Sequence, residues 1–443
     1  MHQAPDNRKR FMWWYFQTNL LHRILTGLFL GAAAGILLGV VSAGQPSPTT
    51  AEQVVGHIRV FGDLFIRLLK IIVVPVVLFS IIGGAASIAP SHLGRVGVKI
   101  LFYYLLTSAV AVALGLGLAG IVKPGAGLHV SGDPSAQVAA RAAPTLSQVF
   151  LGIIPTNPVE SFAKGDMLPI VFFAILFGLG ISLVKDSPIP QTAKAAERLH
   201  ETCIAVADVM YKIVSGVMQY APIGVFALIT IVFAEQGVRA LGPLLLVTAT
   251  VYIGLALQLL VCYGGCLALF GLNITTFLKK GSSALVTAFV TRTSSGSLPV
   301  TLRVTEERLG APRSIASFSL PLGATINMDG TAIYLGVCAM FIGFSVDAPL
   351  SFNQQLTVIV TATLASIGTA GVPGAGAIML LMVMDTIGLP VQAGTNIAAA
   401  YAMILGIDAL LDMGRTGLNV AGDMVGTVIV AKTEKKLDLS AWK

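Results

Sequence analysis

ILGIDALLDMGRTGLNVAGD, residues 404–423, places five polar side chains inside the last long apolar segment of the chain. These side chains are Asp408, Asp412, Arg415, Asn419 and Asp423. Their spacings of 4, 3, 4 and 4 put them within an arc of roughly 80° on one helix face, which we call the polar stripe. Ionisable groups at membrane depth cost several kcal/mol unless they face a protein interior or a watery cavity, so the stripe predicts an ion or substrate site. Ion pairs that lock helices together are the alternative, but five polar groups exceed that need.

The composition of the chain indicates an integral membrane protein. Of its 443 residues, 55% are hydrophobic and 11% are charged, whereas soluble domains have about 25% charged residues. The net charge of +7 does not indicate nucleic-acid binding, because basic residues gather at 8–10 and 432–443, just outside the first and last apolar segments. This pattern predicts two cytoplasmic termini and an even number of crossings of the cell membrane. A signal peptide is the alternative for the N-terminus, which we discount because more membrane segments follow.

Apolar segments long enough to cross a bilayer occupy most of the first 272 residues. We expect spans at residues 20–41, 61–88, 100–122, 168–184, 204–233 and 244–272. Residues 123–148 predict an exposed loop, and the polar stretch 155–166 predicts a break before the fourth span. The four cysteines, Cys203, Cys262, Cys266 and Cys338, lie in apolar stretches, and we interpret them as structural. Cys262 and Cys266 share a helix face, but two thiols without a nearby histidine make a poor metal site.

After Lys280 a pattern occurs twice: an apolar segment with a polar or glycine-rich centre, then an interrupted or charged apolar segment. The first copy comprises residues 282–304, broken at 291–297, and 315–344, broken at 327–330. The second comprises residues 356–387, broken at 368–376, and 397–430. Paired interruptions predict an inverted-repeat transporter whose substrate and ions bind at helix tips near the bilayer midplane.

The two hairpin tips each have a functional and a structural interpretation. The first, TRTSSGS at 291–297, offers hydroxyls and a helix N-terminus to a carboxylate, and an ordinary extramembrane turn is the alternative. The second, GTAGVPGAG at 368–376, lacks the Lys and Ser or Thr of a phosphate loop, since Ala377 and Ile378 follow it. It predicts either a cation shell with a gate or a passive tight hairpin.

One further motif suggests cation binding, and a second set of hydroxyls by itself favours a structural role. NMDGT at 327–331 predicts local unwinding that frees carbonyls beside Asp329. Tyr104, Thr107 and Ser108 share a face of the third span, where hydrogen bonds to their own backbone are the structural alternative. If four acids (Asp329 and the three of the polar stripe) and two arginines (Arg292, Arg415) are buried, their charge is −2. An acidic amino acid then needs roughly three monovalent cations for neutrality.

Four long motifs, in order, resemble the dicarboxylate/amino acid:cation symporter family, which includes excitatory amino-acid transporters and archaeal sodium–aspartate transporters. They are TRTSSGSLPVT at 291–301, GATINMDGTA at 323–332, ASIGTAGVPGAGAIM at 365–379 and the stretch at 404–423. Weaker echoes are GDLFIRLLKIIVVP at 62–75 and YYLLTS at 103–108. The resemblance implies an all-α polytopic membrane protein with eight transmembrane helices, two re-entrant helical hairpins and inverted repeats, which forms a homotrimer of elevator-type transporters. It implies scaffold at residues 1–92 (spans one and two) and 124–237 (spans four and five). The implied transport domain comprises 93–123 (span three) and 238–443 (spans six to eight and both hairpins).

The resemblance also implies roles for individual residues. Arg415 would clamp the side-chain carboxylate of the substrate, and Asp412 would accept its ammonium. The other implied substrate contacts are Arg292, Thr293, Ser294, Thr331, Gly371, Val372, Pro373, Gly374, Thr416 and Asn419. One implied sodium site comprises Gly323, Asn327, Asn419 and Asp423. A second comprises Thr325, Ser366, Ile367 and Thr369, and a third comprises Tyr104, Thr107, Ser108, Asn327 and Asp329.

The pair Asp412 and Arg415 favours an acidic amino acid, because C4-dicarboxylate carriers of this family lack the Asp and neutral amino-acid carriers lack the Arg. Closeness to the archaeal motifs favours L-aspartate over glutamate, and the matching sodium-site motifs favour sodium over protons. By the same resemblance, the tip residue Arg292 argues against potassium countertransport. A proton- or sodium-coupled glutamate or C4-dicarboxylate carrier is the alternative. An intramembrane aspartyl protease fits poorly, since the chain has no Gly-x-Gly-Asp motif and Arg415 would keep Asp412 ionised, so we expect no enzymatic activity. An anion channel is a further rival that uptake against a gradient would distinguish.

Overall fold

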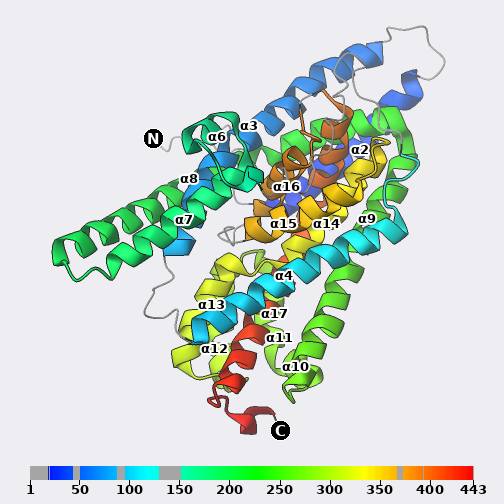
Figure 1. Cartoon of the computed structure of the whole chain (residues 1–443). Helices are drawn as coiled ribbons and strands as arrows, with labels where there is room; N and C mark the ends of the chain where they lie inside the picture. The colour runs from blue at the N-terminus through cyan, green and yellow to red at the C-terminus, as the bar shows by residue number, and fades with distance from the viewer. Residues whose placement is uncertain are drawn as a thin grey trace, which may run out of the picture.

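The computed structural model describes residues 18, 20–42, 50–86, 95–128, 151–366, 373–392 and 394–442, and these ranges contain helices and turns but no β-strand (Figure 1). The expected all-α class is therefore confirmed for this part of the chain. The α-helices are α2 Leu20–Ser42, α3 Thr50–Ala86, α4 Arg95–Val122, α6 Pro158–Lys164, α7 Met167–Lys185, α8 Pro190–Gln236, α9 Leu241–Leu257, α10 Gly264–Leu269, α11 Ile274–Thr291, α12 Ser294–Glu307, α13 Arg313–Ile326, α14 Asp329–Ser345, α15 Phe352–Ser366, α16 Ala375–Thr386 and α17 Asn396–Thr433. Short irregular turns are the 3₁₀ segments η2 Gly237–Ala240 and η4 Leu439–Trp442 and the π segment η3 Gln258–Tyr263.

Six helical stretches in the described ranges are long and apolar enough to cross a membrane. One of them, residues 190–269, has 80 residues and would measure about 120 Å as a straight helix, so it cannot be a single span. The chain turns within it at Gly237, whose φ is 58°, and continues from α8 into α9 (Figure 1). Upstream of it, the polar stretch 155–166 forms the short helix α6 and a turn before α7, as the sequence predicts.

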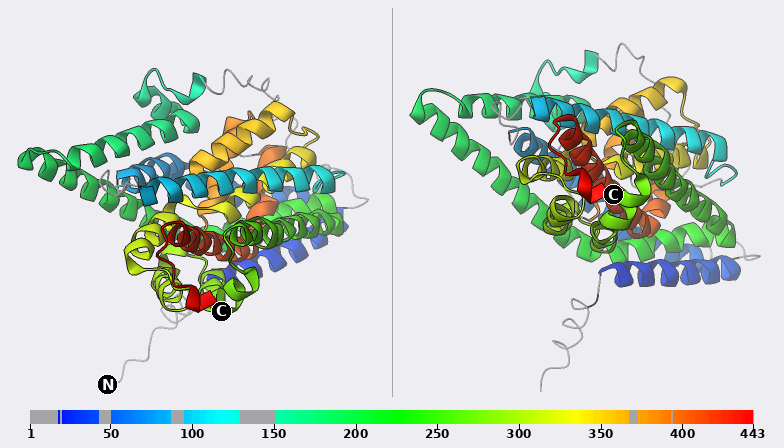
Figure 2. Two further views of the ribbon diagram at one scale, coloured as in Figure 1. Left: turned by 60° about the horizontal axis from the view of Figure 1, so that its bottom comes forward. Right: turned by 90° about the horizontal axis from the view of Figure 1, so that it is seen from below.

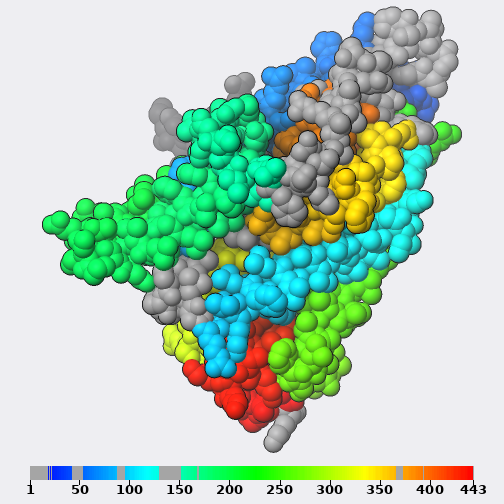
Figure 3. Space-filling view, viewed as in Figure 1, coloured from blue at the N-terminus to red at the C-terminus, as the bar shows by residue number. Residues whose placement is uncertain are grey.

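The helices pack in two groups. The first group comprises the helices α2, α3, α7 and α8, which pack mainly against one another. In the other group α14 packs against α4 and α17, and α11 packs against α17. Figure 2 shows the C-terminal end of α17 surrounded by the helices that follow α9, and Figure 3 shows α4 lying diagonally across the surface between α15 and that end of α17. The groups meet where α3 contacts α13 and α16, and where α17 contacts α2 and α8.

Four glycines of α2 form a smooth stripe that lies directly on α8. Added Cβ atoms at Gly31, Gly35 and Gly39 would lie 2.7, 2.5 and 2.8 Å from backbone carbonyl oxygens of α8, and Gly27 is just as close to Pro222. Because lipid provides no hydrophobic force between helices, this close backbone approach is what holds α2 in place.

The four helices of the two hairpins are too short to cross the membrane singly. At 1.5 Å per residue, α11, α12, α15 and α16 measure about 27, 21, 22 and 18 Å, less than the roughly 30 Å of a hydrocarbon core. The first hairpin turns through only two non-helical residues, Arg292 with φ 55° and Thr293, whose side chain caps α12 by accepting from Gly296 N. The turn is therefore shorter than the predicted interruption 291–297.

The interruption in the next helix is also shorter than predicted. Only Asn327 and Met328 lie outside the helices, and Asp329 and Gly330 already belong to the first turn of α14, so the expected break at 327–330 is corrected to 327–328. The first turn of α14 lacks intrahelical acceptors for its N–H groups, and one of them, Gly330 N, donates to Asn419 Oδ1. Of the expected loop 123–148, residues 123–128 form turns and the rest lies outside the described residues.

The C-terminal residues tie α17 to the base of the first hairpin. Trp442 Nε1 donates to Leu309 O over 2.8 Å, and Asp438 N donates to Gly310 O over 2.9 Å. Lys280 of α11 donates to Ala441 O, and Lys99 of α4 pairs with Glu434 at 2.6 Å. These contacts fix α4, α11 and the turn after α12 around the end of α17.

Replacement of Gly35 by Ala is expected to weaken the packing of α2. The new methyl group would overlap Thr230 O on α8, and overpacking of this kind costs about 1–3 kcal/mol. Thermal unfolding in detergent should therefore begin several degrees lower. Gly117→Ala is the matched control, since no heavy atom lies within 4 Å of its added Cβ, and it should keep or slightly raise the unfolding temperature. Equal unfolding temperatures for the two variants would contradict this account of α2.

Candidate functional site

Arg415 of α17 lies at the centre of a buried ionic cluster. Only 1% of its surface is exposed. Its Nη2 donates to Asp412 Oδ1 over 2.8 Å, and its Nη1 lies 3.1 Å from Asp408 Oδ1. The guanidinium carbon is also 4.0 Å from the ring centroid of Tyr334 on α14, a cation–π contact. Two carboxylates and one guanidinium leave this cluster with a formal charge of −1.

Asp412 and Arg415 both have buried polar atoms that are not satisfied by hydrogen bonds within the protein. Oδ2 of Asp412 and Nε of Arg415 are buried without a hydrogen-bond partner, and Nη1 of Arg415 faces Asp408 Oδ1 as an ion pair without hydrogen-bond geometry. Uncompensated polar atoms in a membrane interior are costly unless a ligand completes them. The open oxygen and the open N–H groups lie in one cluster, so together they fit a ligand that carries both an ammonium and a carboxylate.

Two glycines let the neighbouring helices reach Arg415. A Cβ at Gly376, in the first turn of α16, would overlap the guanidinium, and a Cβ at Gly330 would overlap the Arg415 backbone. Helix α17 also binds α16 through a hydrogen bond of 3.0 Å, which Tyr401 OH donates to Ala377 O. The second hairpin and the first turn of α14 thus enclose the same side chain.

The two hairpin tips meet the polar stripe at a small cavity. Arg292 of the first tip, Gly374 of the second and Asp408 of α17 line a space of about 20 Å³. Its other wall consists of apolar residues of α3 and α8, among them Phe65 and Met218. Arg292 belongs to the first copy of the repeated sequence pattern and Gly374 to the second, so residues of both hairpin tips lie beside Asp408 of α17 at this cavity.

A second polar network surrounds the break before α14. Asn327 Nδ2 donates to Asp423 Oδ1 over 3.0 Å and to Asn419 O over 3.3 Å. Asn419 Oδ1 in turn accepts from Gly330 N over 2.7 Å. Oδ1 of Asn327 is buried without a donor, and a Cβ at Gly323 would lie 2.5 Å from Asp423 Oδ1. Carboxylate, amide and carbonyl oxygens therefore gather here without a protein cation.

Asp329 is the centre of a third network. Its carboxylate accepts hydrogen bonds from Ser108 Oγ at 2.6 Å, Tyr263 OH at 2.7 Å and Gln258 Nε2 at 3.2 Å. The sequence analysis did not include Gln258 and Tyr263, which lie in the π segment η3. A glutamine inside the apolar span 244–272 was the available signal. π-turns frequently mark functional sites because they redirect side chains inward.

The remaining predicted residues are placed as follows. Thr107 donates to Tyr104 O at 3.3 Å, and Tyr104 OH donates to Ser319 O at 3.0 Å, so their present bonds are to backbone. Thr331 Oγ1 lies 3.4 Å from Asn419 Nδ2, and Thr416 is buried on α17. Thr325 donates to Leu322 O and lines a different cavity from Arg292 and Asp408. Gly371, Val372, Ile367, Thr369 and the side chain of Ser366 lie outside the described residues.

Comparison with known proteins places the chain. The family model described as "Sodium:dicarboxylate symporter family" matches residues 20–433. The chain belongs to this family. It is 36% identical over 432 residues to the proton/glutamate-aspartate symporter of Escherichia coli, which covers 95% of each chain. It is 33% identical to the proton/sodium-glutamate symport protein of Geobacillus stearothermophilus, covering 92% of this chain and 93% of the relative. It is 35% identical to the C4-dicarboxylate transport protein of Brucella anthropi, covering 93% and 89%.

Membership in the sodium:dicarboxylate symporter family makes the protein a transporter and not an enzyme. The chain is therefore a polytopic membrane protein for cation-coupled transport of acidic substrates. The aspartyl protease that the membrane aspartates raised as a rival is excluded by this assignment.

Replacement of Gly376 by Ala is expected to disturb the Arg415 cluster and leave the fold intact. The new methyl group would displace the Arg415 guanidinium, so we expect apparent substrate affinity to fall by about tenfold or more. Substrate binding to purified protein, followed by a thermal-shift titration, measures this. Gly265→Ala, which would meet no atom within 4 Å, is the control. Wild-type affinity in Gly376→Ala would show that this close approach is not required.

Proposed function

We propose that the protein is a secondary active, sodium-coupled symporter for acidic amino acids with L-aspartate as its preferred substrate. One observation carries this proposal: a buried arginine with open N–H groups and a buried aspartate with an open oxygen share one cluster between the two hairpins. A diacid fills only the arginine side of this arrangement. An acidic amino acid fills both sides, because its ammonium pairs with Asp412 while its carboxylate pairs with Arg415.

In this proposal the tips close over the substrate. Thr293 and Ser294 at the N-terminus of α12 offer backbone N–H groups and hydroxyls to the second carboxylate. Thr331, Thr416 and Asn419 supply the polar wall, with Pro373, Gly374 and their neighbours as the gate. Arg292, which lines the small cavity with Asp408, lowers the energetic cost of the acids that surround the substrate.

Charge balance supports coupling to cations. Asp329, Asp408, Asp412 and Asp423 are all at most 6% exposed, and with Arg292 and Arg415 they sum to −4 + 2 = −2. Adding an acidic amino acid gives −3, so roughly three monovalent cations neutralise the loaded protein. Asn327 Oδ1, which accepts no hydrogen bond, and the oxygen atoms around Asp423 and Asp329 suit a small alkali cation. Sodium agrees with the family description, whereas relatives named for protons make proton coupling the alternative.

The architecture that we propose has eight spans and two re-entrant hairpins. Dividing the stretch 190–269 at Gly237 raises six candidate spans to seven, and the shorter apolar helix α7 supplies the eighth. The two packing groups correspond to a scaffold of spans one, two, four and five and a moving transport domain that holds the substrate. We propose that three chains associate through their scaffolds, that the transport domains move as elevators and that both termini are cytoplasmic.

Uptake into proteoliposomes tests the function. Labelled aspartate, glutamate and succinate are offered with an inward sodium gradient, with an inward proton gradient and with neither. We expect aspartate to accumulate above its equilibrium level only with sodium. Accumulation driven by a proton gradient alone would show that the protein is coupled to protons and not to sodium. If succinate outcompetes aspartate, the proposed role of Asp412 is wrong. Passive equilibration without accumulation would indicate a channel.

Arg415→Cys should change substrate preference without abolishing the fold. Loss of the guanidinium removes the partner of the side-chain carboxylate, so aspartate uptake should fall by roughly tenfold to a hundredfold while small neutral amino acids gain transport. Competition uptake assays measure both effects. Arg303→Cys, on an exposed arginine of α12, is the control and should retain aspartate preference. Unchanged preference in Arg415→Cys would remove Arg415 from the substrate site.

A further inference from the structure

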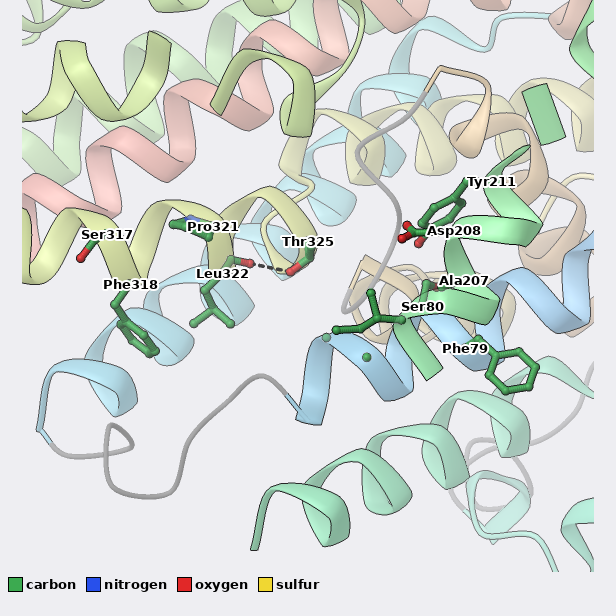
Figure 4. Close-up of a pocket in the computed structure, with 13 residues that line it drawn as sticks. Phe79, Ser80, Ala207, Asp208, Tyr211, Ser317, Phe318, Pro321, Leu322 and Thr325 are labelled. Carbon is green, nitrogen blue, oxygen red and sulfur yellow. Dashed lines mark hydrogen bonds between the residues drawn. The ribbon is translucent and has the colours of Figure 1, made fainter. Parts of the chain in front are cut away.

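A second cavity lies away from Arg415, between α13 on one side and α3 and α8 on the other (Figure 4). Its volume is about 400 Å³, enough for on the order of ten water molecules. We call it the α13 cavity. Its polar lining consists of Ser80, Asp208, Tyr211, Ser317 and Thr325.

Asp208 is an acidic residue of the cavity lining whose side chain is exposed, near the beginning of a membrane span. It lies inside the expected span 204–233, and Figure 4 shows it beside Tyr211 on the α8 wall of the cavity. Among the described residues, no basic side chain comes within ion-pair distance of its carboxylate. The Asp208 side chain is exposed, so water and cations reach it without crossing packed protein, and the exposed Lys212 lies one turn further along α8. Asp208 is therefore positioned to attract cations into the cavity.

The opposite wall offers oxygen atoms along its length. Ser317, Pro321 and Thr325 are spaced by four residues, and all three line the cavity from one face of α13. Pro321 has no N–H, so the Ser317 carbonyl lacks its normal helical donor. Thr325 lies in the last turn, where unpaired carbonyls give the helix its negative end.

The cavity ends close to the proposed cation sites. Thr325 itself belongs to one of them, and two residues further along is Asn327, whose buried Oδ1 has no donor. The substrate side differs, because the space beside Arg292, Gly374 and Asp408 measures only about 20 Å³. In this conformation the cation end of the site adjoins a roomy cavity, mainly apolar with a few polar side chains, while the substrate end is closed off by α3 and α8.

We propose that the α13 cavity is the route by which a transported cation enters or leaves its site, separate from the route of the substrate, and that Asp208 concentrates cations in it. This inference rests on the proposed cation coupling. Asp208 acts here by raising the local cation concentration and does not itself belong to the final binding site.

Transport kinetics of Asp208→Asn give the first test. At saturating aspartate and constant ionic strength, the cation KM should rise about three- to tenfold, because the attraction is lost while the side-chain shape is kept. The aspartate KM at saturating cation should stay at the wild-type value. Glu201→Gln removes an exposed carboxylate of α8 that does not line the cavity and should leave both constants unchanged. A cation KM within twofold of wild type in Asp208→Asn would overturn the role of Asp208.

Cysteine labelling gives a second test that does not require transport. Ser317→Cys is made in a variant whose four native cysteines are replaced, and it is treated with cationic and anionic methanethiosulfonates. The cationic reagent should react about tenfold faster, and Asp208→Asn should abolish that advantage. Ser319→Cys, buried on the other side of α13, should resist both reagents.

The two tests separate the inference from the proposed function. If wild-type protein shows no cation-driven uptake, the proposed function fails, and labelling still reports whether Asp208 selects cations in the cavity. If uptake is cation-driven but Ser317→Cys is unreactive, or reacts equally with both charges, the α13 cavity is a packing gap and the proposed route is wrong.

Discussion

The structure depends on the need to compensate charges inside an apolar environment. Arg415 is almost completely buried, and it is stable there because Asp408, Asp412 and the face of Tyr334 surround its guanidinium. Truncating one member of such a cluster leaves an uncompensated charge, which typically costs several kcal/mol. The same requirement brings the hairpins and the break before α14 to one face of α17, since only protein groups can solvate that face.

Interrupted helices are the means by which polar groups reach the membrane interior. A continuous helix satisfies its own backbone, whereas the ends at Arg292, Asn327 and Gly374 present free N–H and carbonyl groups to the polar stripe. Glycine makes these approaches possible, because any side chain at Gly376 or Gly330 would overlap Arg415. Each break is therefore positioned by packing against α17 as much as by its local sequence.

The boundary between the two packing groups contains both cavities. Packing across it consists of contacts of α3 with α13 and α16, of α7 with α15 and α16, and of α17 with α2 and α8, in contrast to the close glycine packing of α2 on α8. An interface with few locking contacts permits relative movement of the two groups, which a carrier requires. The closed space at the hairpin tips and the open α13 cavity show that the two ends of the site are covered unequally in this conformation.

The sequence by itself determined the helical membrane class, the position of each interruption to within a few residues, and the shared face of the polar stripe, because periodicity and turn residues are local properties. It also indicated Asp329, Asn327 and Asp423, which are polar residues that apolar segments do not otherwise tolerate. Only the tertiary structure decided which groups pair: Asp408 with Arg415, Tyr263 and Gln258 with Asp329, and Gly376 against the guanidinium. These pairs join distant segments, and a π-turn rotates Tyr263 inward, so no local pattern encodes them. Burial and distance in the folded chain determine them instead.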